Sequence, residues 1–289
     1  MRNARDASPD SPSGDQPSRP MDRPLVPSIV AASGEKNSPR LWLVAHAWLI
    51  YVLPLVVFML VGVLEPAPPS AADATSGQSG SSAWFLPYSA YPIVYTLKIV
   101  LTLAAIGFVW PGYRQFPWRL SPWAFVVGVV GIVLWIGLCK LQLEIVHWLS
   151  LDGLTHAGRR SAFNPLVQLA DRPALARAFL AVRFFGLVVV VAIVEEFFLR
   201  GFVIRYFVRN DWWNVAIGEV NRTAIAVAIV VPVLMHPLAT EALAAAAWFG
   251  LVTWLSVRTR NIWDCVVAHG VTNLLLGLYV LYTGEWQFL

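Results

Sequence analysis

Two adjacent glutamates interrupt a long apolar stretch of the sequence. Glu195 and Glu196 lie inside the segment Leu187–Arg200, which reads LVVVVAIVEEFFLR. A charged side chain within a membrane-crossing segment costs roughly 2.5–3.5 kcal/mol on insertion scales, so such a residue indicates a functional site. On a helix, Glu196 and Arg200 are i,i+4 neighbours that can form an ion pair, whereas Glu195 faces about 100° round the axis. We therefore expect Arg200 to pair with Glu196, which leaves Glu195 for chemistry.

Three further polar side chains occur within apolar segments in the same part of the chain. They are His236, His269 and Asn273. His269 and Asn273 are four residues apart, so one helical face presents both. Counted at about 1.5 Å per residue from the cytoplasmic ends of their segments, Glu195, His236 and Asn273 fall between the inner half and the middle of the bilayer. These side chains can therefore meet in one cavity.

A carboxylate beside imidazoles is the equipment of a site that activates water. Glu195 could act as general base, while His236 holds the same water or a metal ion that polarises it. A divalent metal such as zinc would find its ligands in Glu195, His236 and His269. His269 and Asn273 could instead donate hydrogen bonds to the oxyanion of a tetrahedral intermediate. The sequence contains neither the HExxH pattern of zinc proteases nor the GxSxG pattern of serine hydrolases.

The composition is that of an all-α, polytopic integral membrane protein. Of the 289 residues, 57% are hydrophobic and 13% are charged, compared with about 25% charged residues in soluble domains. The net charge of +4 arises mostly from basic residues in the tail and loops, where they act as orientation signals. We find no signal for nucleic-acid binding, and the expected partners are the lipid bilayer and a membrane-associated substrate.

Seven apolar segments are expected to form a helical transmembrane bundle over residues 41–289. A bilayer core requires about 20 apolar residues per helix. The mixed segment 150–173 could hold an eighth membrane element. Residues 1–40, which contain seven prolines, predict a disordered tail. The expected spans are Leu41–Leu64, Pro92–Trp110, Trp123–Leu138, Ala174–Val208, Thr223–Leu238, Glu241–Val257 and Cys265–Tyr282.

The distribution of basic residues predicts the orientation of the bundle. With seven spans, a cytoplasmic N-terminus puts most of the basic loops inside, in agreement with the positive-inside tendency. The segment 65–91, on the opposite side, carries no Lys or Arg. Three arginines in 150–173 run against the pattern. We expect Leu289 to lie on the side opposite to the tail.

Three motifs in order resemble a known family, the CAAX-protease and bacteriocin-processing (Abi) intramembrane endopeptidases. EEFFLRG is similar to the E-E-x-x-x-R motif of the family, and AHGVTN is similar to its H-x-x-x-N motif. The stretch WFGLVTWLSVRTRNIWDCVVAH resembles the part of the family that precedes the second motif. The resemblance covers roughly 175–283 and implies a protease-like core at about 174–283.

The resemblance implies a glutamate-dependent peptide hydrolase and a role for each polar residue. Glu195 and His236 would activate the water, and His269 and Asn273 would bind the oxyanion. Glu196 and Arg200 would support the site. The implied substrate is a membrane-associated protein or peptide.

One position departs from the family pattern. The middle motif is usually F-x-x-x-H, but Pro232 stands in place of the phenylalanine, in the sequence PVLMHP. Pro232 and Pro237 flank His236 and interfere with a regular helix there. The region also resembles the subfamily associated with exosortases, which implies a bacterial cytoplasmic membrane and an exosortase-type sorting system as partner.

Two other functions use the same residues. A transporter or proton relay could employ the glutamates and histidines as a proton path, although we detect no internal repeat of the kind common in transporters. A catalytically silent membrane scaffold would keep the fold but lose the geometry near Pro232. In that case Glu196 and Arg200 are only an intrahelical ion pair, and His269 with Asn273 only joins helices.

Overall fold

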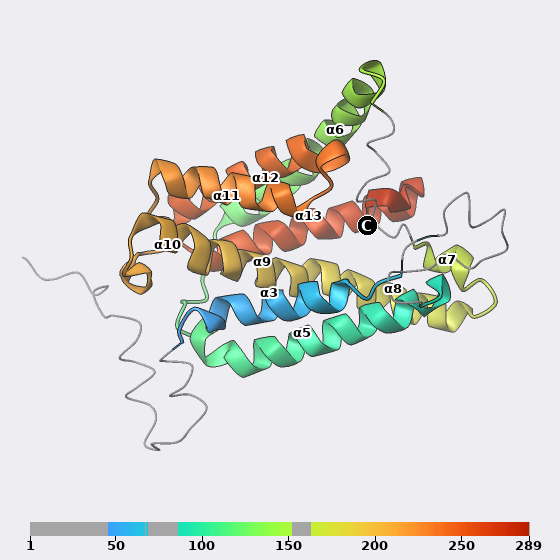
Figure 1. Cartoon of the computed structure of the whole chain (residues 1–289), viewed down its shortest axis with the longest axis horizontal. Coiled ribbons are helices and arrows are strands. Elements are labelled where there is room, and N and C mark those ends of the chain that lie inside the picture. The colour runs from blue at the N-terminus through green and yellow to red at the C-terminus, as the bar shows by residue number, and fades with distance from the viewer. Residues whose placement is uncertain (1–45, 67, 69–85, 152–162, 289) are drawn as a thin grey trace, which may run out of the picture.

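The computed structural model describes residues 46–66, 68, 86–151 and 163–288, and within these ranges it contains helices and no strands. The tail 1–40 lies outside the described residues, and so do residues 152–162 of the segment 150–173, in which an eighth membrane element was expected. The prediction of an all-α bundle is confirmed (Figure 1). The apolar helices are α3 (Leu49–Gly62), α5 (Tyr91–Tyr113), α6 (Pro122–Trp148), the continuous α8 (Pro173–Phe185) to α10 (Ile204–Val208), α11 (Arg222–Met235), α12 (Leu238–Thr259) and α13 (Ile262–Thr283).

Five of these elements are long and apolar enough to cross a membrane. They are Tyr88–Tyr113, Pro122–Trp148, Pro173–Val208, Leu238–Thr259 and Ile262–Thr283. The helices α3 and α11 have 14 residues each. At 1.5 Å per residue they measure about 21 Å, which is less than the roughly 30 Å of a hydrocarbon core. Each predicted apolar segment thus contains a helix, but the first and the fifth are shorter than a full span.

The predicted fifth span, Thr223–Leu238, is wrong at its C-terminal end. The helix α11 ends at Met235, and His236 has extended backbone angles, φ −107° and ψ 159°. The cause is Pro237, because a proline disfavours helical backbone in the residue before it. Pro232, by contrast, is accommodated within α11. His236 therefore lies in an elbow between α11 and α12, not within a helix.

The fourth span forms the centre of the bundle. It runs as one helical element from Pro173 to Val208 (Figure 1). The helices α3 and α5 pack together on one side of it, and α13 packs along its other side. The helices α6, α11 and α12 form the part of the bundle beyond α13. The stretch that carries both glutamates, α9 (Ala192–Glu196), thus lies between the two groups of helices.

Side-chain caps fix where the C-terminal helices begin. The Asn221 side chain accepts a hydrogen bond from the Ala224 N–H at the start of α11, and Asn261 caps α13 in the same way. Both bonds satisfy N–H groups that have no partner within the helix. At the start of α6, the N–H and the hydroxyl of Ser121 donate to the two carboxylate oxygens of Asp264 on α13. This clasp fixes the register between α6 and α13.

Two π-helical segments flank the glutamates. They are Gly186–Val191 and Phe197–Val203, and the five α-helical residues of α9 separate them. Segments of this type are rare and often occur at functional sites. The first of them makes a close contact with α13, because a Cβ atom on Gly270 would lie 2.7 Å from the carbonyl oxygen of Val188. The π-helical backbone and α13 are thus in direct contact beside the glutamates.

Candidate active site

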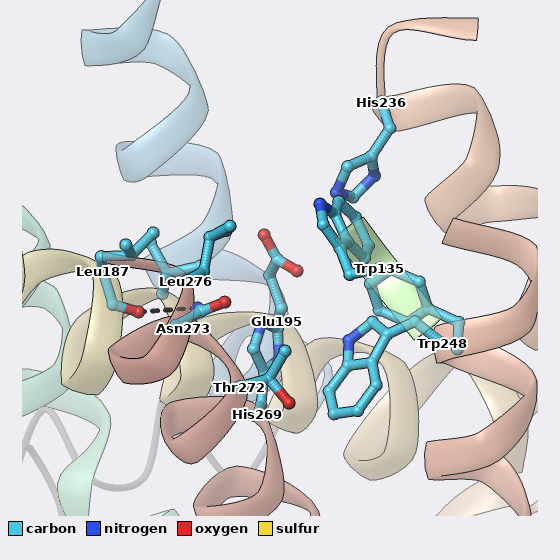
Figure 2. A pocket seen from close by; sticks show the side chains of 11 residues that line it. Trp135, Leu187, Glu195, His236, Trp248, His269, Thr272, Asn273 and Leu276 are labelled. Atoms are coloured by element: carbon cyan, nitrogen blue, oxygen red, sulfur yellow. Dashed lines mark hydrogen bonds between the residues drawn. The ribbon is translucent and has the colours of Figure 1, made fainter. Parts of the chain in front are cut away.

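A small cavity at the centre of the bundle collects most of the residues expected to do chemistry. Its volume is about 60 Å³, which is enough for more than one water molecule but not for a peptide. Side chains from α6, the central helix, the elbow, α12 and α13 line it (Figure 2). The polar lining residues are Glu195, His236, His269, Thr272 and Asn273.

Glu195 reaches this cavity from α9. Its side chain is half-buried, and Figure 2 shows the carboxylate pointing into the space between α13 and the elbow. In the described part of the chain, no side chain forms a hydrogen bond or an ion pair with it. The carboxylate is therefore placed to accept a hydrogen bond from a water molecule in the cavity.

Glu196 faces away from the cavity and is fully buried. Its Oε2 lies 2.9 Å from Nη1 of Arg200, so the predicted i,i+4 ion pair is confirmed. The contact is not aligned as a hydrogen bond, and Arg200 also donates through Nη2 to the carbonyl oxygen of Phe249 on α12. The other oxygen of Glu196 lies 2.8 Å from Nδ1 of His269 on α13. Glu196 thus connects the central helix to α13, and Arg200 connects it to α12.

The contact with Glu196 determines which ring nitrogen of His269 carries a proton. A carboxylate accepts hydrogen bonds, so Nδ1 of the imidazole carries the proton. In the neutral ring Nε2 then carries the lone pair, and it donates only when the ring is doubly protonated. The rings of Trp248 and Phe249 pack against the imidazole at centroid distances of 5.9 and 6.3 Å. The orientation of His269 is therefore fixed by both a hydrogen bond and aromatic packing.

His236 is held by its own helix end. Its Nδ1 lies 2.7 Å from the carbonyl oxygen of Pro232, and this nitrogen must donate because a carbonyl only accepts. Nε2 is then the nitrogen with the lone pair in the neutral ring. The imidazole packs edge-on against Trp135 of α6 at 5.4 Å and Phe249 of α12 at 5.7 Å between ring centroids. The elbow therefore presents His236 to the cavity from the side of α6 and α12.

Asn273 uses part of its hydrogen-bonding capacity on the π-helical segment. Its Nδ2 donates to the carbonyl oxygen of Leu187 at 2.9 Å, as Figure 2 shows. An amide nitrogen carries two hydrogens, so one N–H remains for another acceptor. On the same helix, the Thr272 hydroxyl donates to the carbonyl oxygen of Gly128 at 2.9 Å. These bonds attach α13 to the central helix on one side and to α6 on the other.

The arrangement of the donors does not fit a metal centre. Among the described residues, no group of three or more His, Cys, Asp or Glu side chains is placed to hold a metal ion. Glu195, His236 and His269 line the same cavity, and in both imidazoles the bond of Nδ1 within the protein leaves Nε2 as the nitrogen with the lone pair. The chemistry below is therefore derived from side chains and water alone.

Sequence reasoning missed the aromatic part of the site. Trp135, Trp248 and Phe249 line the cavity beside the two histidines, and the contact between Glu196 and His269 was not expected. The aromatic residues lie within apolar segments, where their type carries no functional signal. The contact with His269 joins residues 73 positions apart, which no local pattern can indicate.

One segment within the C-terminal half of the chain is similar to a family of known proteins. Residues 177–275 match the family described as type II CAAX prenyl endopeptidase Rce1-like. No curated protein and no solved structure matches the chain. The matched segment begins in α8, ends in α13 and contains Glu195, Glu196, Arg200, His236, His269 and Asn273. The resemblance to CAAX proteases inferred from the motifs is confirmed for this segment.

Proposed function

Because residues 177–275 of this membrane protein match the Rce1-like CAAX-protease family, we propose that the chain is a peptide hydrolase that cleaves a membrane-associated protein or peptide by a glutamate-dependent mechanism. The observation that carries the proposal is the shared cavity of Glu195 and His236. Among the described residues no side chain pairs with the carboxylate of Glu195, and the cavity beside it is large enough for a water molecule.

In the proposed mechanism, both residues act on one water molecule. One O–H of the water donates to the carboxylate of Glu195, and the other donates to Nε2 of His236. The water oxygen attacks the carbonyl carbon of the scissile peptide bond as Glu195 takes the first proton. When the tetrahedral intermediate collapses, the C–N bond breaks and Glu195 gives this proton to the departing nitrogen. The products are a carboxylic acid and an amine, and Glu195 returns to its ionised form.

The side chains of α13 are proposed to stabilise the oxyanion. Asn273 has one N–H available beyond its bond to Leu187, and such donors lower the barrier when they point to where charge develops. His269, whose Nδ1 bonds to Glu196, contributes a second donor through Nε2 when it is doubly protonated. Glu196 and Arg200 hold this helix and α12 in place and do not contact the reacting atoms.

A bound divalent metal such as zinc stays a prediction of the sequence. When bound, it would polarise a water molecule or the substrate carbonyl. Elemental analysis of the purified protein tests it: the donor arrangement leads us to expect less than one metal ion per chain, and a stoichiometric metal that Glu195→Gln removes would contradict our mechanism.

Replacement of Glu195 by glutamine tests the proposed function. The purified protein is incubated in detergent with membrane extract, and released peptides are identified by mass spectrometry. Glu195→Gln keeps the volume but removes the base, so peptide release should slow by about a hundredfold or more. His236→Ala should behave similarly, and the double variant should lose little more, since effects of groups that act on one water are not additive.

The matched control is Glu144→Gln, which removes an exposed glutamate from α6. It should release the same peptides at the wild-type rate. Near-normal release by Glu195→Gln would overturn the mechanism and favour the proton relay or the silent scaffold. The exosortase-type partner and the bacterial cytoplasmic membrane also stay predictions. The released peptides identify the substrate, and they therefore test whether it belongs to an exosortase-type sorting system.

A further inference from the structure

Helix α6 contributes two side chains to the surroundings of the elbow, although it lies outside the segment that matches the family. Trp135 packs against the ring of His236. Gln142 lies seven residues later, and this spacing places both on one face of the helix. Both side chains are buried. One face of α6 therefore supports the elbow along two turns.

Gln142 forms two hydrogen bonds with the backbone of α12. Its Nε2 donates to the carbonyl oxygen of Leu238 at 2.6 Å, and its Oε1 accepts from the N–H of Leu243 at 2.9 Å. A reversed amide would place two carbonyl oxygens against each other, so the pattern of donor and acceptor fixes its orientation. Gln142 thus clamps the first turns of α12, beginning two residues after His236.

The elbow needs such a clamp because the backbone of His236 lies outside α11 and α12. Its backbone is extended, and the helix α12 begins only at Leu238. The position of the imidazole thus depends on where the first turn of α12 lies relative to α6. Loss of the clamp would allow the elbow to move away from Trp135 and from the cavity.

We propose that Gln142 is a positioning residue that keeps His236 in the cavity opposite Glu195. The proposal depends on the proposed function for its catalytic consequence, but the placement of His236 can be measured without turnover. Gln142 acts through the backbone of Leu238 and Leu243 and touches no reacting atom.

Chemical modification of the imidazoles measures the placement directly. Wild type, Gln142→Met and the control Leu141→Ala are treated with diethyl pyrocarbonate, and mass spectrometry follows the modification of His236 relative to His269. Methionine keeps the shape of the side chain but forms neither bond, so the relative rate at His236 should rise about tenfold, as expected from the loss of two hydrogen bonds. Leu141 is exposed on α6, and its variant should match wild type. An unchanged rate in folded Gln142→Met overturns the proposal.

Gln142→Glu provides a second test, in which protonation of the new side chain restores the clamp. This test can be made even if Gln142→Met does not fold. A neutral carboxyl group reproduces both bonds, because its O–H donates to Leu238 and its carbonyl accepts from Leu243. A carboxylate cannot donate. The modification rate of His236, divided by the wild-type rate at the same pH, should approach one at low pH and rise as pH increases. A ratio that does not change with pH contradicts the clamp.

Turnover separates this inference from the proposed function. With a peptide that the wild type releases, Gln142→Met should lower kcat by about ten- to a hundredfold with little change in KM, the size expected from a misplaced catalytic group. In a His236→Ala background it should have no further effect. If Glu195→Gln is active, the proposed glutamate-dependent cleavage is refuted, but the modification rates still show whether Gln142 positions His236. If Glu195→Gln is inactive and Gln142→Met is fully active, only the role of Gln142 fails.

Discussion

A single added methyl group on α13 should disturb the site more than its size suggests. Gly270 lies between His269 and Val271, and a Cβ atom there would lie 2.7 Å from the carbonyl oxygen of Val188. Cβ contacts below 3.0 Å essentially do not occur. Because the oxygen belongs to the backbone of the π-helical segment, no side-chain rotation can relieve the clash. Gly270→Ala therefore forces α13 and the central helix apart.

The geometry sets the expected magnitude. Ordinary van der Waals contact begins at 3.4 Å, so the two helices must separate by about 0.7 Å, and overpacking of this kind costs about 1–3 kcal/mol. Asn273 and His269 are on the displaced helix and bond to Leu187 and Glu196 across the same interface. Since a shift of about 1 Å can cost about a hundredfold in rate, we expect cleavage to fall by about tenfold or more.

Thermal unfolding in detergent and peptide release are the two assays. Glycine-to-alanine replacement also favours a helix by up to about 1 kcal/mol, and Gly107→Ala on α5 isolates this effect, because nothing lies within 4 Å of its added Cβ. Gly107→Ala should unfold at or above the wild-type temperature and retain full activity. If Gly270→Ala were as stable and as active as Gly107→Ala, the close packing of α13 against the π-helical segment would be refuted.

Two further predictions concern folding and orientation. Arg200→Ala should lower the yield of folded protein, because loss of one partner from a buried ion pair reduces the stability of the fold by about 3–5 kcal/mol. A normal yield with abolished turnover would instead make Arg200 a participant in the reaction. Single cysteines introduced into the tail and near Leu289 should react with a membrane-impermeant reagent from opposite sides, since the basic loops predict a cytoplasmic tail; reaction of both from one side would contradict the predicted seven spans.

The sequence predicts the helices well because their signal is local. Apolar runs of sufficient length indicate membrane helices; each of the expected segments contains a helix, and five of these helices are long enough to cross a membrane. The ion pair of Glu196 and Arg200 follows from helical spacing alone and is confirmed. The meeting of Glu195, His236, His269 and Asn273 in one cavity could be expected because polar groups at one depth of a bilayer have few other partners.

The remaining features depend on tertiary contacts that have no local signature. The first π-helical segment arises in a run of valines and the second in the sequence FFLRGFV, and neither sequence marks a departure from an ordinary helix. The end of α11 at Met235 follows from Pro237, but the proline does not indicate where the imidazole points. That direction depends on Trp135 and Phe249, which come from two other helices.

The active site is consequently larger than the segment that matches the family. The matched residues 177–275 contain every side chain proposed to contact the water or the oxyanion, but they do not include α6. Through Trp135 and Gln142, α6 positions the elbow that carries His236. Through the carbonyl oxygen of Gly128, it also holds Thr272 on α13, next to Asn273. Because one helix supports both sides of the cavity, a displacement of α6 would separate the proposed water-activating groups from the proposed oxyanion donors without changing any of them.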